Sequence, residues 1–158
     1  MRPGVVVIGV GNPYRRDDGV GPAVVDRLRG AGLSGVTLAE SDGEACALML
    51  LWHGRRLAIV VDAVRAEPPC PGRVHRLVVP WPAPPGRSAG THATGPADAV
   101  ALARALARLP QRLVVYGVEA ADTGFGPGLS PSVASAADRL AALIIGEARA
   151  AGRAGTRA

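Results

Sequence analysis

Three side chains able to bind a metal ion or transfer a proton stand beside apolar or glycine-rich segments of this 158-residue sequence: Asp18, Asp62 and His92. Asp62 ends the apolar run 57–61, where a carboxylate is costly to bury without a partner or a ligand. Two carboxylates and one imidazole give a divalent transition metal three ligands and leave positions open for substrate. Affinity alone does not choose among nickel, zinc, copper and manganese, and the same groups could do acid–base chemistry without a metal.

The elements that must position these side chains are predicted by the pattern of apolar residues. Continuous β-branched runs indicate strands buried on both faces, and an alternating run indicates an edge strand. The predicted strands are 5–8, 36–39, 57–61, 73–79 and 113–118, and the predicted helices are 22–29, 45–52, 94–109 and a last one from 131 onward. The gap before 73–79 is too short for a crossover helix, so this strand should be antiparallel.

This alternation predicts an α/β fold with three layers: a twisted, mostly parallel five-stranded sheet with one antiparallel edge strand, and helices on both faces. We expect a single domain over 1–150 and a frayed tail over 151–158. Ligands of such sheets lie outside the carboxyl ends of the strands. The residues predicted at that edge are Asp18, Asp42, Asp62, Glu119 and Asp122, with His92 in the loop that enters the third helix.

Two turns carry residues that commonly cap helices. Ser41 or Asp42 is expected to cap the helix 45–52. Ser130 is expected to cap the last helix, with Pro131 at its first position, where a missing N–H costs nothing.

Composition limits the partners of the chain. The net charge is +5, but all 18 basic residues are arginines scattered without a basic run, which argues against a nucleic-acid partner. Apolar stretches are too short for a signal sequence or a membrane span, so we expect no membrane partner and a cytoplasmic location. Cys46 and Cys70 form no CxxC motif and are expected to be buried free thiols in a reducing compartment.

Two motifs match other chemistries only in part. The glycines at 9 and 11 follow a strand, as in a dinucleotide-binding loop, but Tyr14 stands where the third glycine belongs. The segment 86–90 has the letters of a serine-hydrolase nucleophile elbow, but a proline-rich stretch precedes it where that motif requires a strand. We therefore reject both interpretations.

The ordered set of motifs resembles the hydrogenase maturation proteases, the endopeptidases that trim the large subunit of nickel–iron hydrogenases. The matching segments are 7–12 with 17–21, then 41–43, 59–64 and 91–92, supported by 117–119 and 129–133. These segments span most of the chain. The resemblance implies a twisted sheet with helices on both faces, in agreement with the fold expected from the apolar pattern.

The resemblance also implies roles for individual residues. The nickel-binding and catalytic positions of the family fall on Asp18, Asp62 and His92. The substrate would be the nickel-loaded precursor of a large subunit, which loses a short C-terminal extension. Nickel would then be supplied by the substrate, with zinc or cadmium as alternative ions in the isolated protein. Substrate-binding roles are expected for four further residues: Asn12, Asp17, Asp42 and Gly43.

Some residues depart from the family pattern. Glu44 stands where the family usually has a small residue, and the stretch 80–85 is unusually rich in proline. These departures affect the identity of the substrate more than the class of reaction. Two alternatives stay open at this point: a nickel-checking chaperone that does not cleave, and a metallohydrolase of the same fold that keeps its own metal.

Overall fold

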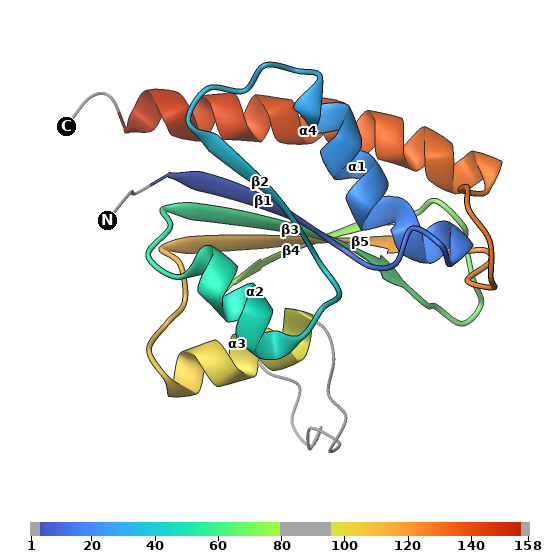
Figure 1. The fold of residues 1–158 in the computed structure, drawn as a ribbon, viewed down its shortest axis with the longest axis horizontal. Coiled ribbons are helices and arrows are strands. Elements are labelled where there is room, and N and C mark those ends of the chain that lie inside the picture. The colour runs from blue at the N-terminus through green and yellow to red at the C-terminus, as the bar shows by residue number, and fades with distance from the viewer. Residues whose placement is uncertain (1–3, 80–95, 156–158) are drawn as a thin grey trace.

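A computed structural model of the chain describes residues 4–79 and 96–155 (Figure 1). Its strands are β1 (Val5–Val10), β2 (Val36–Ser41), β3 (Leu57–Val64), β4 (Val74–Val79) and β5 (Arg112–Glu119). Its helices are the short 3-10 helix η1 (Arg16–Gly19), then α1 (Val20–Arg29), α2 (Ala45–Trp52), α3 (Pro96–Ala105) and α4 (Pro131–Ala154).

The five strands form one sheet in the order β2-β1-β3-β5-β4. The pairs β1–β2, β1–β3 and β3–β5 are parallel, and β4 pairs with β5 in the antiparallel direction. The predicted fold class is therefore confirmed, including the antiparallel edge strand. The nine residues between Val64 and Val74 allow only a short return of the chain, which explains why β4 runs against its neighbour.

Helices cover both faces of the sheet, with α1 and α4 on one face and α2 and α3 on the other (Figure 1). The side chains of β1 alternate between the two cores: Val5 and Val7 pack with α1 and α4, and Val6 and Ile8 pack with α2 and α3. Burial on both faces explains why the sequence of this strand is apolar at consecutive positions.

Helix α1 begins at Val20, two residues before the predicted start, and the C-terminal ends of two other helices differ from the prediction. Helix α4 continues to Ala154, so residues 151–154 are helical where we expected a frayed tail. The reason is tertiary, because Ala151 packs on the core and its carbonyl accepts a hydrogen bond of 2.6 Å from Arg56. Helix α3 ends at Ala105 rather than at 109, and Ala107 adopts a left-handed φ of 53°.

Both predicted caps are corrected in detail. Glu44, rather than Ser41 or Asp42, caps α2, because its carboxylate accepts the N–H groups of Cys46 and Ala47 at 3.0 and 2.9 Å. Ser130 does occupy the cap position of α4, but its side chain makes no capping bond. Its hydroxyl donates a hydrogen bond to Asp17 instead.

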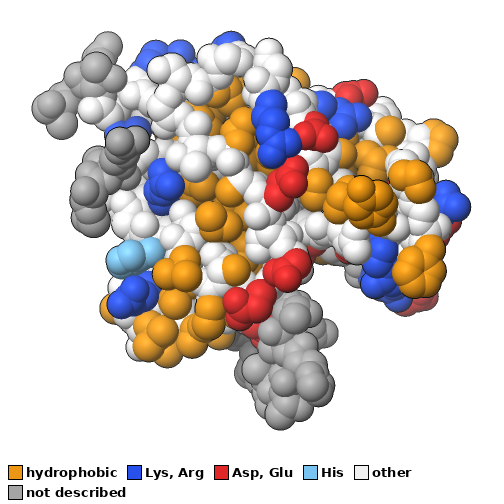
Figure 2. Space-filling view, viewed as in Figure 1, with side chains coloured by type: hydrophobic (Ala, Val, Ile, Leu, Met, Phe, Trp, Pro, Cys, Tyr) orange, Lys and Arg blue, Asp and Glu red, His pale blue; other side chains and the backbone are white. Residues whose placement is uncertain are grey.

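The surface agrees with one compositional expectation and corrects another. On the face shown in Figure 2, basic side chains are interspersed with acidic and uncharged ones and form no broad patch. Cys46 and Cys70 are free thiols, but both are exposed rather than buried. Within 4–79 and 96–155, no helix combines the length and the apolar character needed to cross a bilayer.

Candidate active site

Close packing of backbone places η1 and α1 directly against the ends of β1 and β3. A Cβ added at Gly21 would lie 2.5 Å from the Val10 nitrogen and 2.5 Å from the Val61 carbonyl oxygen. A Cβ at Gly9 would likewise collide with the carbonyl of Gly21. Only glycine permits this approach, which brings the loop carrying Asp18 to the carboxyl edge of the sheet.

The loop after β1 also orients the Asp18 carboxylate. Gly11 has a φ of +132°, and the chain turns so that the N–H of Asn12 donates to Oδ2 of Asp18 at 2.8 Å. The Asn12 side chain is used within the same turn, since its Oδ1 accepts the N–H of Tyr14 at 2.9 Å. Asn12, predicted to bind substrate, therefore acts in this structure on the position of Asp18.

Asp18 and Asp62 line the same hollow at this edge, which has a volume of about 190 Å³. Its lining residues are Val10, Gly11, Asp18, Asp42, Gly43, Asp62 and Ala63. Burial raises the pKa of Asp62 to about 7; the N–H of Ala63 offsets part of this effect and the nearby charge of Asp18 adds to it. Two carboxylates held this way favour a bound cation, because it would relieve their repulsion.

Asp42 and Gly43 reach the hollow from the turn between β2 and α2. Gly43 has a φ of 95°, and its N–H donates to the Ser41 hydroxyl at 3.1 Å. Oδ1 of Asp42 accepts the N–H of Glu44, also at 3.1 Å. The structure thus brings both predicted substrate-binding residues to the hollow that Asp62 also lines, and contact with substrate stays a prediction.

Asp17 has a structural role in the fold, and the substrate-binding role predicted for it stays a prediction. Its side chain is fully buried, and it accepts the N–H groups of Ala121, Asp122 and Ser130 at 2.9, 2.9 and 2.7 Å. Burial by itself raises the pKa of Asp17, but the hydrogen bonds from Ser130, Asp122 and Ala121 together lower that pKa below its ordinary value. Asp17 thereby fixes the loop that joins β5 to α4.

Glu119 is a second buried carboxylate with its partners in place, at the end of β5. Oε1 accepts the N–H of Cys70 at 3.1 Å, and Oε2 lies 3.0 Å from Nε2 of His75 and 3.6 Å from Nε of Arg73. The N–H of Cys70 and the side chain of His75 lower the pKa of Glu119 against the effect of burial, with help from Arg73. Glu119 therefore fastens the β3–β4 connection to β5 rather than lining the hollow.

His92 and the segment 86–90 lie outside the described residues. Among the residues described, no cluster of three His, Cys, Asp or Glu side chains is arranged to hold a metal ion. The structure thus brings together two of the three predicted ligands, Asp18 and Asp62. The third ligand and its geometry stay a prediction.

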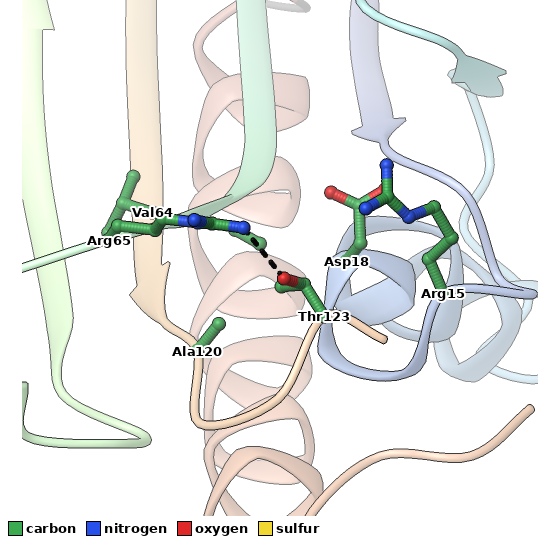
Figure 3. A pocket seen from close by; sticks show the side chains of 7 residues that line it. Arg15, Asp18, Val64, Arg65, Ala120 and Thr123 are labelled. Carbon is green, nitrogen blue, oxygen red and sulfur yellow. Dashed lines mark hydrogen bonds between the residues drawn. The ribbon is translucent and has the colours of Figure 1, made fainter. Parts of the chain in front are cut away.

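Sequence reasoning did not find a second hollow on the other side of Asp18. It has a volume of about 90 Å³ and is lined by Arg15, Asp18, Ala63, Val64, Arg65, Ala120 and Thr123 (Figure 3). Arg65 follows directly after β3 and Arg15 precedes η1, so each stands close in sequence to a site aspartate. That proximity in sequence could have indicated the two arginines as site residues. A single arginine among many scattered ones, however, gives no reason by itself to assign it a role.

Comparisons with known proteins support this description of the fold. The hydrogenase maturating endopeptidase HybD from Escherichia coli is similar in structure, with a TM-score of 0.74 at 22% identity over 94% of each chain. HybD from Thermococcus kodakarensis, a nickel–iron hydrogenase maturation protease, gives 0.69 at 20% identity, covering 92% of this chain and 99% of its own. HycI from the same organism gives 0.68 at 21% identity over 93% of both chains.

A comparison with curated proteins gives no match. The family model described as HycI, hydrogenase maturation protease, matches residues 34–147, well over half of the 158 residues. This match includes Asp42 and Asp62 and begins after Asp18. The chain belongs to the hydrogenase maturation proteases, a family of endopeptidases and therefore of hydrolases.

Proposed function

We propose that the protein removes a C-terminal extension from the nickel-loaded large-subunit precursor of a nickel–iron hydrogenase. The observation that carries this proposal is the pair Asp18 and Asp62. Asp18 lies on η1, after β1, and Asp62 lies near the carboxyl end of the neighbouring parallel strand β3; both line one hollow in a chain of the maturation-protease family. Carboxylates are suitable ligands for a divalent ion that arrives already bound to the substrate.

In this proposal the nickel is part of the substrate, and it holds the scissile bond beside the carboxylates. Asp18 and Asp62 bind the ion, and His92 is the third ligand. Because the ion fixes the substrate, much of the rate enhancement comes from proximity and orientation. A water molecule attacks the peptide carbonyl, and the carboxylates lining the hollow are the side chains that can accept its proton and return it to the leaving amine.

The test is the intact mass of a nickel-loaded large-subunit precursor, measured with and without the protein. We expect a discrete loss of mass at the C-terminus with the wild-type protein, and none with Asp18→Asn or Asp62→Asn. Asp138→Asn is the matched control, because Asp138 is an exposed carboxylate on α4 that pairs with Arg27 at 2.6 Å. It should process the precursor like the wild-type protein.

Three results would overturn the proposal. Precursor binding without shortening would favour a nickel-checking chaperone. Stoichiometric nickel, zinc or cadmium in the purified protein, together with cleavage of generic peptides, would favour a metallohydrolase with a resident metal. Full processing of the precursor by Asp62→Asn would contradict the proposal that Asp18 and Asp62 form one shared site.

A further inference from the structure

The two hollows that meet at Asp18 have opposite chemistry. The larger is lined by the carboxylates of Asp18, Asp42 and Asp62. The smaller is lined by the guanidinium groups of Arg15 and Arg65 and shares the Asp18 carboxylate with the larger one. Both hollows are also lined by Ala63, so they are adjacent compartments along one edge of the sheet. A ligand lying across Asp18 would meet an acidic compartment on one side and a basic one on the other.

Arg65 is held across the basic compartment by a defined contact. Its Nη2 donates a hydrogen bond of 2.9 Å to Oγ1 of Thr123, in the loop after β5 (Figure 3). This bond uses one of the five N–H donors of a guanidinium group that lines the hollow, and it does not use the other four.

Arg15 approaches from the opposite side (Figure 3). Its guanidinium carbon lies 6.0 Å from the centre of the Phe125 ring, and its carbonyl accepts the N–H of Asp18 at 3.1 Å. Phe125 is 90% exposed, so its ring stands at the surface beside Arg15. Thr123 and Phe125 belong to the loop that the buried Asp17 fixes, and this loop therefore contacts both arginines.

Neither Arg15 nor Arg65 forms an ion pair with a carboxylate of the described residues. Arg16, next to Arg15 in sequence, and Arg73, in the same β3–β4 connection as Arg65, do form such pairs. Arg16 lies 3.3 Å from Asp122, and Arg73 lies 3.6 Å from Glu119. Among the described residues that line this small hollow, Asp18 supplies one carboxylate against the two guanidinium groups, so the excess positive charge favours an anionic ligand. A planar carboxylate matches the fork of N–H donors that guanidinium groups present.

We propose that Arg15 and Arg65 form a carboxylate-binding subsite for the extension that is cut away. This inference rests on the proposed function. The nickel-bearing part of the substrate occupies the acidic compartment because it carries the cation. The chain on the other side of the scissile bond then continues past Asp18 into the basic compartment. Its carboxylate is either an acidic side chain of the extension or the terminal carboxylate of the precursor.

The processing assay tests the subsite through the split between KM and kcat. For the variant carrying both Arg15→Gln and Arg65→Gln, we expect KM for the nickel-loaded precursor to rise about 10-fold, since two exposed charge pairs together contribute on the order of 1.4 kcal/mol. We expect kcat to stay within about two-fold, because the lost interaction contributes to binding alone. Arg139→Gln is the matched control, since Arg139 is exposed on α4 and bonds to Ser135.

Altered substrates separate the two sources of the carboxylate. In one precursor the acidic residues of the extension are replaced by Asn or Gln, and in another the terminal carboxylate is amidated. The precursor that lacks the recognised carboxylate should show a raised KM with the wild-type protein and no further rise with the double variant. If the double variant matches the wild-type protein on every precursor, the subsite is wrong while the proposed function stands.

Direct binding distinguishes failure of the subsite from failure of the proposed function. If the wild-type protein does not shorten the precursor, the proposed function fails, and the subsite is then tested with a synthetic peptide of the extension. Shifts of the arginine side-chain NMR signals that are lost in the double variant and absent with an amidated, neutralised peptide would support the carboxylate subsite. No shift at either arginine would overturn it.

Discussion

Asp17 and Asp18 are consecutive carboxylates with opposite surroundings. The Asp17 side chain is fully buried, and its oxygens accept hydrogen bonds from the loop that joins β5 to α4. The Asp18 side chain accepts the N–H of Asn12 and lines both hollows at the sheet edge. The hydrogen bonds of the fold thus use the Asp17 carboxylate. The Asp18 carboxylate is positioned by one hydrogen bond but faces the hollows where a ligand could bind.

The same contrast separates Glu119 from Asp62. Hydrogen bonds and a neighbouring charge lower the pKa of Glu119, whereas burial and the charge of Asp18 raise the pKa of Asp62 to about 7. A carboxylate with its partners in place stabilises the fold, and one that lacks them costs stability. We infer that Asp17 and Glu119 serve the structure, and that Asp18 and Asp62 serve binding and catalysis.

The largest expected effect is on processing by Asp18→Asn, which should fall by roughly 10³-fold, in the range lost with catalytic acid–base groups. The asparagine keeps an oxygen that can accept the N–H of Asn12, so the loop should persist. The measurement is the rate of precursor shortening, with thermal unfolding as the control. A variant that unfolds early instead would place Asp18 with Asp17, among the structural carboxylates.

Replacing Asp17 should have its main effect on stability rather than on catalysis, the reverse of the result expected for Asp18. Asp17→Ala removes the acceptor of three backbone N–H groups, and at about 1 kcal/mol for each the free energy of unfolding should fall by about 3 kcal/mol. Denaturant unfolding measures this loss. Asp138→Ala, which removes an exposed partner of Arg27, should change it by less than about 1 kcal/mol. Equal losses in the two variants would contradict the structural role of Asp17.

The sequence predicts the sheet well because burial on both faces requires consecutive apolar residues. The runs around Val5, Leu57 and Leu113 show this, and Asp62, which follows the apolar run of β3, stands at the edge where ligands bind. The edge strand followed from its alternating apolar pattern and from the short connection before it, which leaves no room for a crossover helix. The sequence therefore predicts that Asp18 and Asp62 lie at the same carboxyl edge of the sheet.

Contacts between residues distant in sequence could not be predicted in this way. The partners of Asp17 lie more than 100 residues away, so its sequence neighbourhood indicated only a turn or a ligand position. The same limit hid the contacts of Arg15 with Phe125 and of Arg65 with Thr123. Each of these roles depends on where one loop packs, and apolar periodicity carries no information on that.

The contrast also predicts a gain in stability from Asp62→Asn in the presence of a chelator. Because the fold raises the pKa of Asp62, ionising this carboxyl costs free energy; the cost grows above its ordinary pKa of 3.8 and levels off above about 7. The variant should exceed the wild-type protein by at least about 1 kcal/mol at pH 8 and by less at pH 5. A variant less stable than the wild-type protein at pH 8 would show that Asp62 has structural partners after all.

The smallest expected effect is the acid response of Glu119→Gln. A carboxyl whose pKa is lowered by the fold contributes stability that is complete above its ordinary pKa of 4.5 and is lost as the pH falls through the lowered value. The glutamine keeps an acceptor for the N–H of Cys70 but gives up the charge that faces His75 and Arg73. The variant should therefore be less stable than the wild-type protein at pH 6, and the difference should shrink as the pH falls from about 5 to 3. Thermal unfolding across this range measures it. A difference that stays constant would mean that the hydrogen-bond geometry of Glu119, rather than its charge, holds the β3–β4 connection against β5.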